Sequence, residues 1–274
     1  MAIHSFLKVE KGDPDWQFSP ESYFGKEFKI IDASTIEISK GIKDLIVLRQ
    51  DPNDKCLLAK HIKITAKEDS TLDLMIINDA DEKVQQIFMY DVHLYQGSTI
   101  NFGIFLKGGR FNKHIIQVYL EEGATFNSFG LMTNDTGGDT EIITKIVHQN
   151  LNTTSRQFVL GRAGGNSQTV FQGMTILDEG SEGSEAGIES MNLVTGKDGR
   201  CFNKPEVYAT CDGVKSHIGQ VTEHLSADKI YYLQTRGLDP NQAVKSVVNS
   251  FHKQVTTLIP YKDLKEEIEQ IFSI

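Results

Sequence analysis

Four copies of one turn-like segment decide the fold of this chain: EDSTLDL (68–74), QGSTINF (96–102), EGATFNS (122–128) and LNTTSRQ (151–157). Their central threonines stand at positions 71, 99, 125 and 154. The spacing is nearly constant, at 28, 26 and 29 residues. A repeat of this length is typical of a solenoid, in which each coil buries its inner face only against its neighbours.

Between these turns, apolar residues alternate with other residues, as in Ile100, Phe102 and Ile104. This alternation has the period of a half-buried β-strand. Glycine pairs at 108–109 and 137–138 mark the opposite ends of the coils. The pattern therefore predicts a mainly β protein, either a β-helix or an ordinary sandwich or jelly roll, whose strands also recur at regular spacing.

The C-terminal part of the chain has a helical pattern instead. Ser226 is a candidate N-cap before ADKIYYLQTR, and Asp239 precedes a proline at the first position of a second helix. A third helix is expected over residues 261–272. Four residues of the second helix form one apolar stripe: Val244, Val247, Val248 and Phe251.

Composition excludes several classes of protein. The chain has 274 residues, a net charge of −9 and 39% hydrophobic residues, with no apolar run long enough to span a bilayer. The acidic balance disfavours nucleic-acid and anionic-membrane partners. The N-terminus has no secretory signal pattern, and three cysteines, an odd number, argue against a disulfide framework. We therefore expect a cytoplasmic protein with reduced thiols.

Two thiols and an imidazole stand close together in the sequence before the helical part. Cys201, Cys211 and His217 fall within seventeen residues, and such groups suit a soft metal or an iron–sulfur site if adjacent strands bring them together. An acidic, glycine-rich stretch at 178–189 offers a different chemistry, the carboxylate pair of a carbohydrate-active β-helix enzyme. Its composition, however, is that of a solvated loop.

Several segments resemble the SufB/SufD family, the scaffold proteins of the SUF iron–sulfur cluster assembly system. The resemblance rests on VFQGMTIL (170–177), KPEVY (204–208), VKSH (214–217), IYYLQTRGL (230–238) and AVKSVVNSF (243–251), in the family's order and spacing. It implies a right-handed parallel β-helix followed by a short helical segment. We therefore expect an irregular segment at 1–45, a β-helix core at 46–222 and a helical segment at 223–274.

The resemblance also implies a function: a non-catalytic scaffold that holds a nascent iron–sulfur cluster at a dimer interface. The dimer would form with a second copy or with a SufB/SufD paralogue, and a sulfur donor is a further expected partner. A SufC-type ABC ATPase would dock on the helical segment through five residues: Tyr232, Val244, Val247, Val248 and Phe251. The chain itself has no GxxxxGK[ST] loop to bind a nucleotide.

The resemblance assigns the cluster ligands to Cys201 and His217, whereas Cys211 has no clear family counterpart. One departure bears on this assignment, because Ile218 follows the histidine where SufB-type proteins have a glutamate. The chain thus combines a SufB-like cysteine with a SufD-like histidine turn. Two alternatives stay open: a purely structural SufD-like partner without cluster ligands, and a β-helix carbohydrate-active enzyme.

Overall fold

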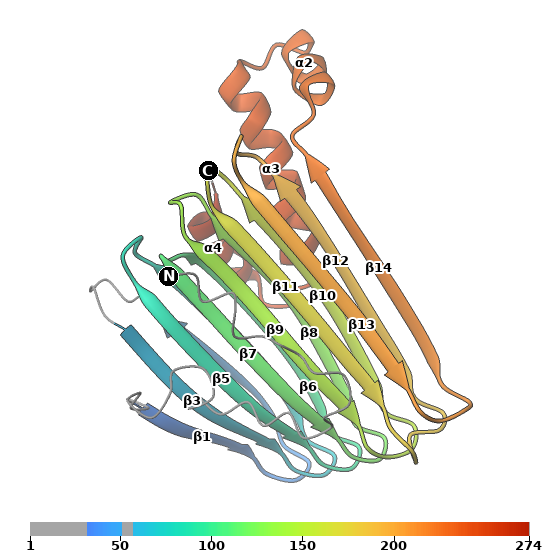
Figure 1. The fold of residues 1–274 in the computed structure, drawn as a ribbon. Helices are drawn as coiled ribbons and strands as arrows, with labels where there is room; N and C mark the ends of the chain where they lie inside the picture. Colours follow the sequence, from blue (N-terminus) through green and yellow to red (C-terminus); the bar gives the residue numbers. More distant parts are fainter. Residues whose placement is uncertain (1–31, 51–56, 274) are drawn as a thin grey trace.

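A computed structural model describes residues 32–50 and 57–273 and shows a stack of β-strand coils followed by helices (Figure 1). The strands of this described part are β1 (Asp32–Ile38), β2 (Lys43–Gln50), β3 (Leu57–Ala66), β4 (Thr71–Ala80), β5 (Gln85–Leu94), β6 (Thr99–Gly108), β7 (Phe111–Leu120), β8 (Thr125–Asn134), β9 (Asp139–His148), β10 (Thr154–Ala163), β11 (Gln168–Leu177), β12 (Glu185–Val194), β13 (Arg200–Ala209) and β14 (Lys215–His224). Its helices are α2 (Ala227–Thr235), α3 (Pro240–Thr256) and α4 (Lys262–Phe272).

The strands form two parallel seven-stranded sheets. Odd-numbered strands make one sheet in the order β1-β3-β5-β7-β9-β11-β13, and even-numbered strands make the other. Each coil therefore gives one strand to each sheet, which confirms the parallel β-helix and excludes the antiparallel sandwich. Within the described residues, the short strands β1 and β2 belong to the coils and lie before the repeats that are recognisable in the sequence.

The repeated threonines are stacked in register. Thr71 pairs with Thr99, Thr99 with Thr125, and Thr125 with Thr154, each as the first residue of its strand in the even-numbered sheet. Residues at equivalent coil positions thus form rows that cross the strands. The residue two positions after each threonine forms a second such row, since side chains alternate between the two faces of a sheet.

The turns before these strands share one left-handed position. Asp69, Gly97, Gly123 and Asn152 have φ values of 56°, 67°, 67° and 57°. Backbone hydrogen bonds join successive turns there, from Asp69 N to Gln96 O and from Gly97 N to Glu122 O. Glycine, asparagine and aspartate are the residues that tolerate this conformation best. The EDS, QGS, EGA and LNT segments therefore encode the turn of each coil.

Apolar side chains from both sheets fill the space between them. Large aromatic residues such as Phe88, Phe102 and Phe126 are completely buried there. Several buried polar groups in this interior are paired with one another, as where the Tyr90 hydroxyl lies 3.1 Å from His114 Nδ1. The alternation read from the sequence therefore corresponds to the inward-facing residues of each strand.

The helices begin where the sequence analysis expected. Ser226 caps α2, and Asp239 caps α3 in a capping box with Gln242, with Pro240 at the first helical position. Helices α3 and α4 pack on the outer face of the even-numbered sheet, whereas α2 stands beyond the end of the strands (Figure 1). None of the helices in the described ranges is long and apolar enough to cross a membrane.

Candidate functional site

Cys201 is the second residue of β13, near the end of the coils where the helices lie. Its sulfur accepts a hydrogen bond of 3.2 Å from the Thr169 hydroxyl of the neighbouring strand β11. Burial, opposed by this hydrogen bond, raises the pKa of the Cys201 thiol. The thiol is therefore protonated at neutral pH, and it must lose its proton before it can bind a metal.

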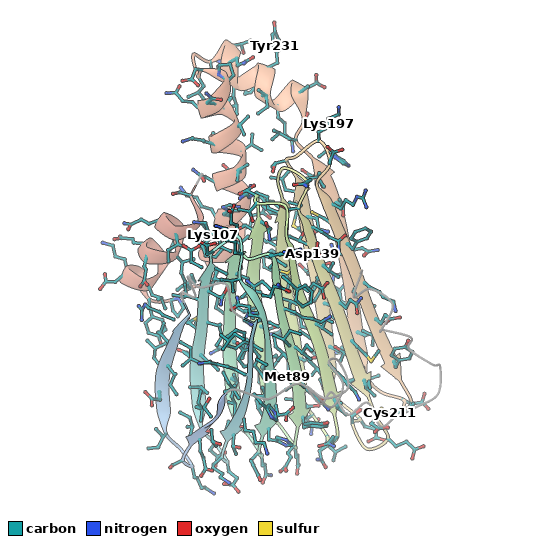
Figure 2. The ribbon with its side chains drawn as sticks, turned by 60° about the vertical axis from the view of Figure 1, so that its left-hand side comes forward. Met89, Lys107, Asp139, Lys197, Cys211 and Tyr231 are labelled. Carbon is teal, nitrogen blue, oxygen red and sulfur yellow. The ribbon has the colours of Figure 1, made fainter. Side chains whose placement is uncertain are left out.

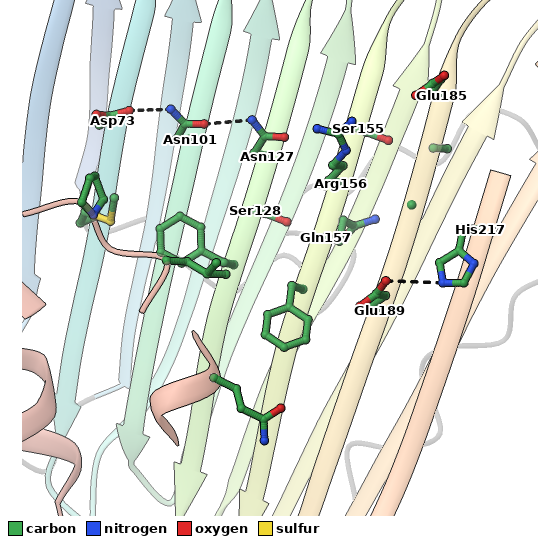
Figure 3. A pocket seen from close by; sticks show the side chains of 18 of the residues that line it. Asp73, Asn101, Asn127, Ser128, Ser155, Arg156, Gln157, Glu185, Glu189 and His217 are labelled. Carbon is green, nitrogen blue, oxygen red and sulfur yellow. Dashed lines mark hydrogen bonds and ion pairs between the residues drawn. The ribbon is translucent and has the colours of Figure 1, made fainter. Parts of the chain in front are cut away.

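His217 is the third residue of β14, on the outer face of the even-numbered sheet. Its Nε2 atom lies 3.4 Å from Glu189 Oε1 of β12, and the imidazole is 68% exposed (Figure 3). The ring can therefore reach a partner or a metal without any rearrangement of the fold. The Glu189 carboxylate can orient the imidazole, as carboxylates often orient metal-binding histidines.

The structure does not bring Cys201 and His217 together within one chain. They stand on β13 and β14, which belong to different sheets and run in opposite directions. Cys201 near the start of β13 therefore lies beside the end of β14, about six residues, or about 20 Å, along the strand from His217. Cys211 lies in the turn at the other end of β13, with its sulfur 3.2 Å from the Ser181 hydroxyl (Figure 2). Within the described ranges, no three His, Cys, Asp or Glu side chains form a group that could hold a metal ion.

The residues expected to bind a partner divide into two groups. Val248 and Phe251 are buried against the outer face of the even-numbered sheet, in a cluster that includes Phe105, Leu131 and Leu160. Val244 and Val247 of the same helix are only partly buried. Tyr232 of α2 is instead 56% exposed and lies 5.3 Å from the Arg236 guanidinium. Only part of the predicted surface is therefore free in this chain.

Two outward-facing carboxylates of the acidic stretch at 178–189, Glu185 and Glu189, do not form the carboxylate pair of a glycosidase. Glu185 and Glu189 both point outward from β12, but four residues of strand separate them by about 13 Å, more than such pairs allow. A hydrogen bond from Lys215 lowers the pKa of Glu185, whereas a catalytic acid needs a raised pKa. Carbohydrate cleavage therefore has no support in this region.

A groove on the outer face of the even-numbered sheet was not foreseen from the sequence. It has a volume of about 1060 Å³ and runs from Lys43 on β2 to His217 on β14, below the segment that joins α3 to α4. Asp73, Asn101 and Asn127 form a hydrogen-bonded ladder along it, with Nδ2–Oδ1 distances of 2.7 and 3.0 Å (Figure 3). The sequence could have predicted this ladder, because each of the three residues stands two positions after a repeated threonine.

Comparison with known proteins gives a family assignment. Residues 26–251 match the family model described as SUF system FeS cluster assembly, SufBD core domain. An iron–sulfur cluster assembly SufBD family protein of Synechocystis sp. is 27% identical over 169 residues, which cover 61% of this chain and 37% of that protein. The iron–sulfur cluster assembly protein SufD of Escherichia coli is 24% identical over 181 residues, covering 65% and 42%.

A SufBD family protein of Arabidopsis thaliana, named as chloroplastic, is 25% identical over 149 residues, which cover 54% of this chain and 26% of the relative. The chain thus matches less than half of the length of each of these three relatives. The family model, in contrast, spans most of this chain, including all the strands from β1 to β14 and most of α3. The chain therefore belongs to the SufBD core domain family of the SUF iron–sulfur cluster assembly system.

Proposed function

We propose that this chain is a non-catalytic scaffold subunit that pairs through its last coil and receives a nascent iron–sulfur cluster as cargo. The observation that carries the proposal is the open end of the solenoid. Nine of the ten residues of β14 are exposed, and within the described part of the chain this strand is paired on one side only, with β12. An unpaired strand edge of this kind is a template for pairing with another chain.

Apolar side chains on the last coil support pairing at this end. Phe202 and Tyr208 of β13 are 51% and 50% exposed, and Ile218 and Val221 of β14 are each 45% exposed. Exposed apolar side chains concentrated on one edge are typical of a protein–protein contact. The partner is a second copy of this chain or another SufBD-type protein.

Pairing of two last coils would resolve the separation of the two proposed ligands. In this arrangement the β14 strands of two chains pair in antiparallel fashion around a two-fold axis at the middle of the strand. Residue 217 of one chain then lies opposite residue 222 of its partner. Cys201 lies at about the level of residue 223 in its own chain, because β13 and β14 run in opposite directions. The thiol of one chain and the partner's His217 would then stand at the same level of the interface, which favours a cluster shared between chains.

Anaerobic reconstitution with iron and sulfide tests the ligand assignment. We expect a brown species with sulfur-to-iron charge-transfer absorption, which Cys201→Ser should weaken several-fold and His217→Ala should make more labile, since each removes one bond to the cluster. Cys56→Ser is the matched control for nonspecific iron uptake, although Cys56 lies outside the described residues. Equal losses in the Cys201 and Cys56 variants would leave the chain as a structural, SufD-like partner.

A SufC-type ABC ATPase would dock on α2 in this proposal. Every residue of α2 is at least partly exposed, and the helix projects beyond the strands with Tyr231 68% and Tyr232 56% exposed (Figure 2). Exposed tyrosines beside an arginine are typical anchors of a binding surface. This exposure supports docking on α2 rather than on the buried side of α3.

The double change Tyr231→Asp with Tyr232→Asp is expected to abolish copurification with such an ATPase, because it puts two charges into an apolar contact. Far-UV circular dichroism should remain that of the unchanged protein. Ile42→Asp is the matched control, since Ile42 is 51% exposed but lies at the opposite end of the solenoid. Normal ATPase binding by the double variant would move the docking surface away from α2.

A further inference from the structure

The groove on the outer face of the even-numbered sheet has two parallel tracks of different chemistry. One track is the polar ladder of Asp73, Asn101 and Asn127. The other is an apolar row two residues further along the strands, which includes Met75 and Phe129. Two residues of strand separate the tracks by about 7 Å. An occupant must therefore be polar along one edge and apolar along the other.

The segment between α3 and α4 contacts the polar track at Asp73. The Tyr261 hydroxyl donates a 2.5 Å hydrogen bond to Asp73, which raises the pKa of Tyr261 to about 12. Asn101 donates to the same carboxylate, and Asn127 donates to Asn101. All these bonds run in one direction, so the Asn127 Oδ1 atom at the end of the ladder is directed toward the next strand as an acceptor.

Arg156 continues the polar row on β10, next to Asn127. It forms no hydrogen bond or ion pair with any side chain in the described ranges, although it is close enough to Glu185 to lower the pKa of that carboxyl slightly through its charge. The next carboxylates along the groove already have side-chain partners, since Glu185 contacts the Lys215 ammonium and Glu189 contacts the His217 imidazole. The positive charges of Arg156 and of Lys43, which also lines the groove, thus favour a negatively charged occupant.

Gly187 leaves a gap in the row between Arg156 and His217. A Cβ atom at this position would meet nothing closer than the Ser155 carbonyl oxygen, at 4.0 Å. The backbone of β12 therefore carries no side chain at this point of the groove, beside Arg156. Space beside an available guanidinium is what an incoming carboxylate requires.

The length of the groove suits a short extended peptide. The part from Asp73 on β4 to His217 on β14 crosses six strands, a distance of about 24 Å at the usual spacing between strands. Seven residues of extended chain span about the same distance. In an extended peptide, alternate side chains point to opposite edges, which matches one polar and one apolar track.

We propose that this groove binds an extended segment of a partner protein in which acidic residues alternate with apolar ones. Its apolar side chains lie along Met75, Phe129 and Phe158, and one carboxylate pairs with Arg156 above Gly187. The site is separate from α2, and it reaches β14 only at its His217 end, so it adds a third contact surface to those of the proposed function.

The test uses the full chain and two fluorescein-labelled heptapeptides, one alternating leucine with glutamate and the other alternating leucine with lysine. Fluorescence anisotropy should show at least tenfold tighter binding of the acidic peptide. Arg156→Glu should reverse this preference, because the charge at the centre of the groove changes sign. Gly187→Leu should weaken the acidic peptide at least tenfold by filling the gap, and its Cβ atom has space in the folded chain.

Lys197→Glu is the control for a general effect of charge, since Lys197 is exposed in the turn between β12 and β13 (Figure 2) and does not line the groove. It should bind both peptides as the unchanged protein does. Equal affinity for the two peptides, or normal binding by Gly187→Leu, would overturn the proposal. A protein that binds neither peptide, and whose dimer dissociates in light scattering when Gly187 becomes leucine, would identify a second copy as the occupant and also overturn it.

Discussion

Phe251→Asp is expected to release the C-terminal helices from the solenoid and to lower the free energy of unfolding by at least about 4 kcal/mol. Phe251 is 8% exposed and packs in the cluster that joins α3 and α4 to the even-numbered sheet. The substitution removes a buried aromatic ring and places a carboxylate in an apolar environment. Urea unfolding followed by circular dichroism measures the loss.

Tyr231→Asp is the matched control, because it introduces the same charge at an exposed position of the neighbouring helix α2. We expect its urea midpoint to stay within about 0.5 kcal/mol of the unchanged protein. Limited proteolysis should cut only the Phe251 variant rapidly between α2 and α3. Similar midpoints for both variants would show that α3 contributes little to the stability of the solenoid.

The second large effect is a loss of stability in mild acid. Burial lowers the pKa of three histidines, to about 3 for His114, about 4 for His148 and about 3 for His252. In the unfolded chain these groups bind a proton near pH 6.5, whereas in the folded chain they stay neutral. Stability is therefore complete above about pH 6.5 and falls as the pH drops from there toward 4.

Each such histidine contributes a slope of about 1.4 kcal/mol per pH unit, so the three together contribute up to about 4 kcal/mol per unit below pH 6. Urea midpoints at pH 7.5, 6.5 and 5.5 measure this slope. His148→Gln should reduce it by roughly a third, whereas the exposed His224→Gln should leave it unchanged. A midpoint that does not move between pH 7.5 and 5.5 would contradict the burial of these rings.

The environment of His148 explains why a neutral ring is tolerated in the interior. Its two ring nitrogens lie 2.7 Å from the Thr153 hydroxyl and 2.8 Å from the Ser155 hydroxyl. Hydroxyl groups can serve as donor to one nitrogen and acceptor from the other. A proton added to the ring would leave a charge surrounded by neutral groups, which costs free energy in a buried site.

The coil repeat and the helix caps could be predicted from the sequence because both are set by local chemistry. Thr99 and Thr125 recur at the coil period and stack in register, and Ser226 and Asp239 cap the helices that follow them. A turn needs a residue that tolerates positive φ, and a helix needs a side-chain acceptor at its start. These requirements act over a few residues and are therefore visible in sequence.

The placement of the functional groups depended on the tertiary structure. Cys201 and His217 are sixteen residues apart in sequence, yet they lie at opposite ends of strands in different sheets. The apolar stripe of α3 does not reveal whether it binds the solenoid or a partner, because amphipathic periodicity is the same in both cases. The structure places Val248 and Phe251 against the sheet and leaves Tyr232 exposed.

The sequence by itself thus determined that the chain forms stacked β coils with a capped helical segment, since those features follow from short-range periodicity and turn chemistry. Only the tertiary structure decided which residues meet in space. The ladder of Asp73, Asn101 and Asn127 and the gap at Gly187 form because strands from separate coils pair in register. Burial and contacts between coils depend on that long-range pairing, which no local pattern specifies.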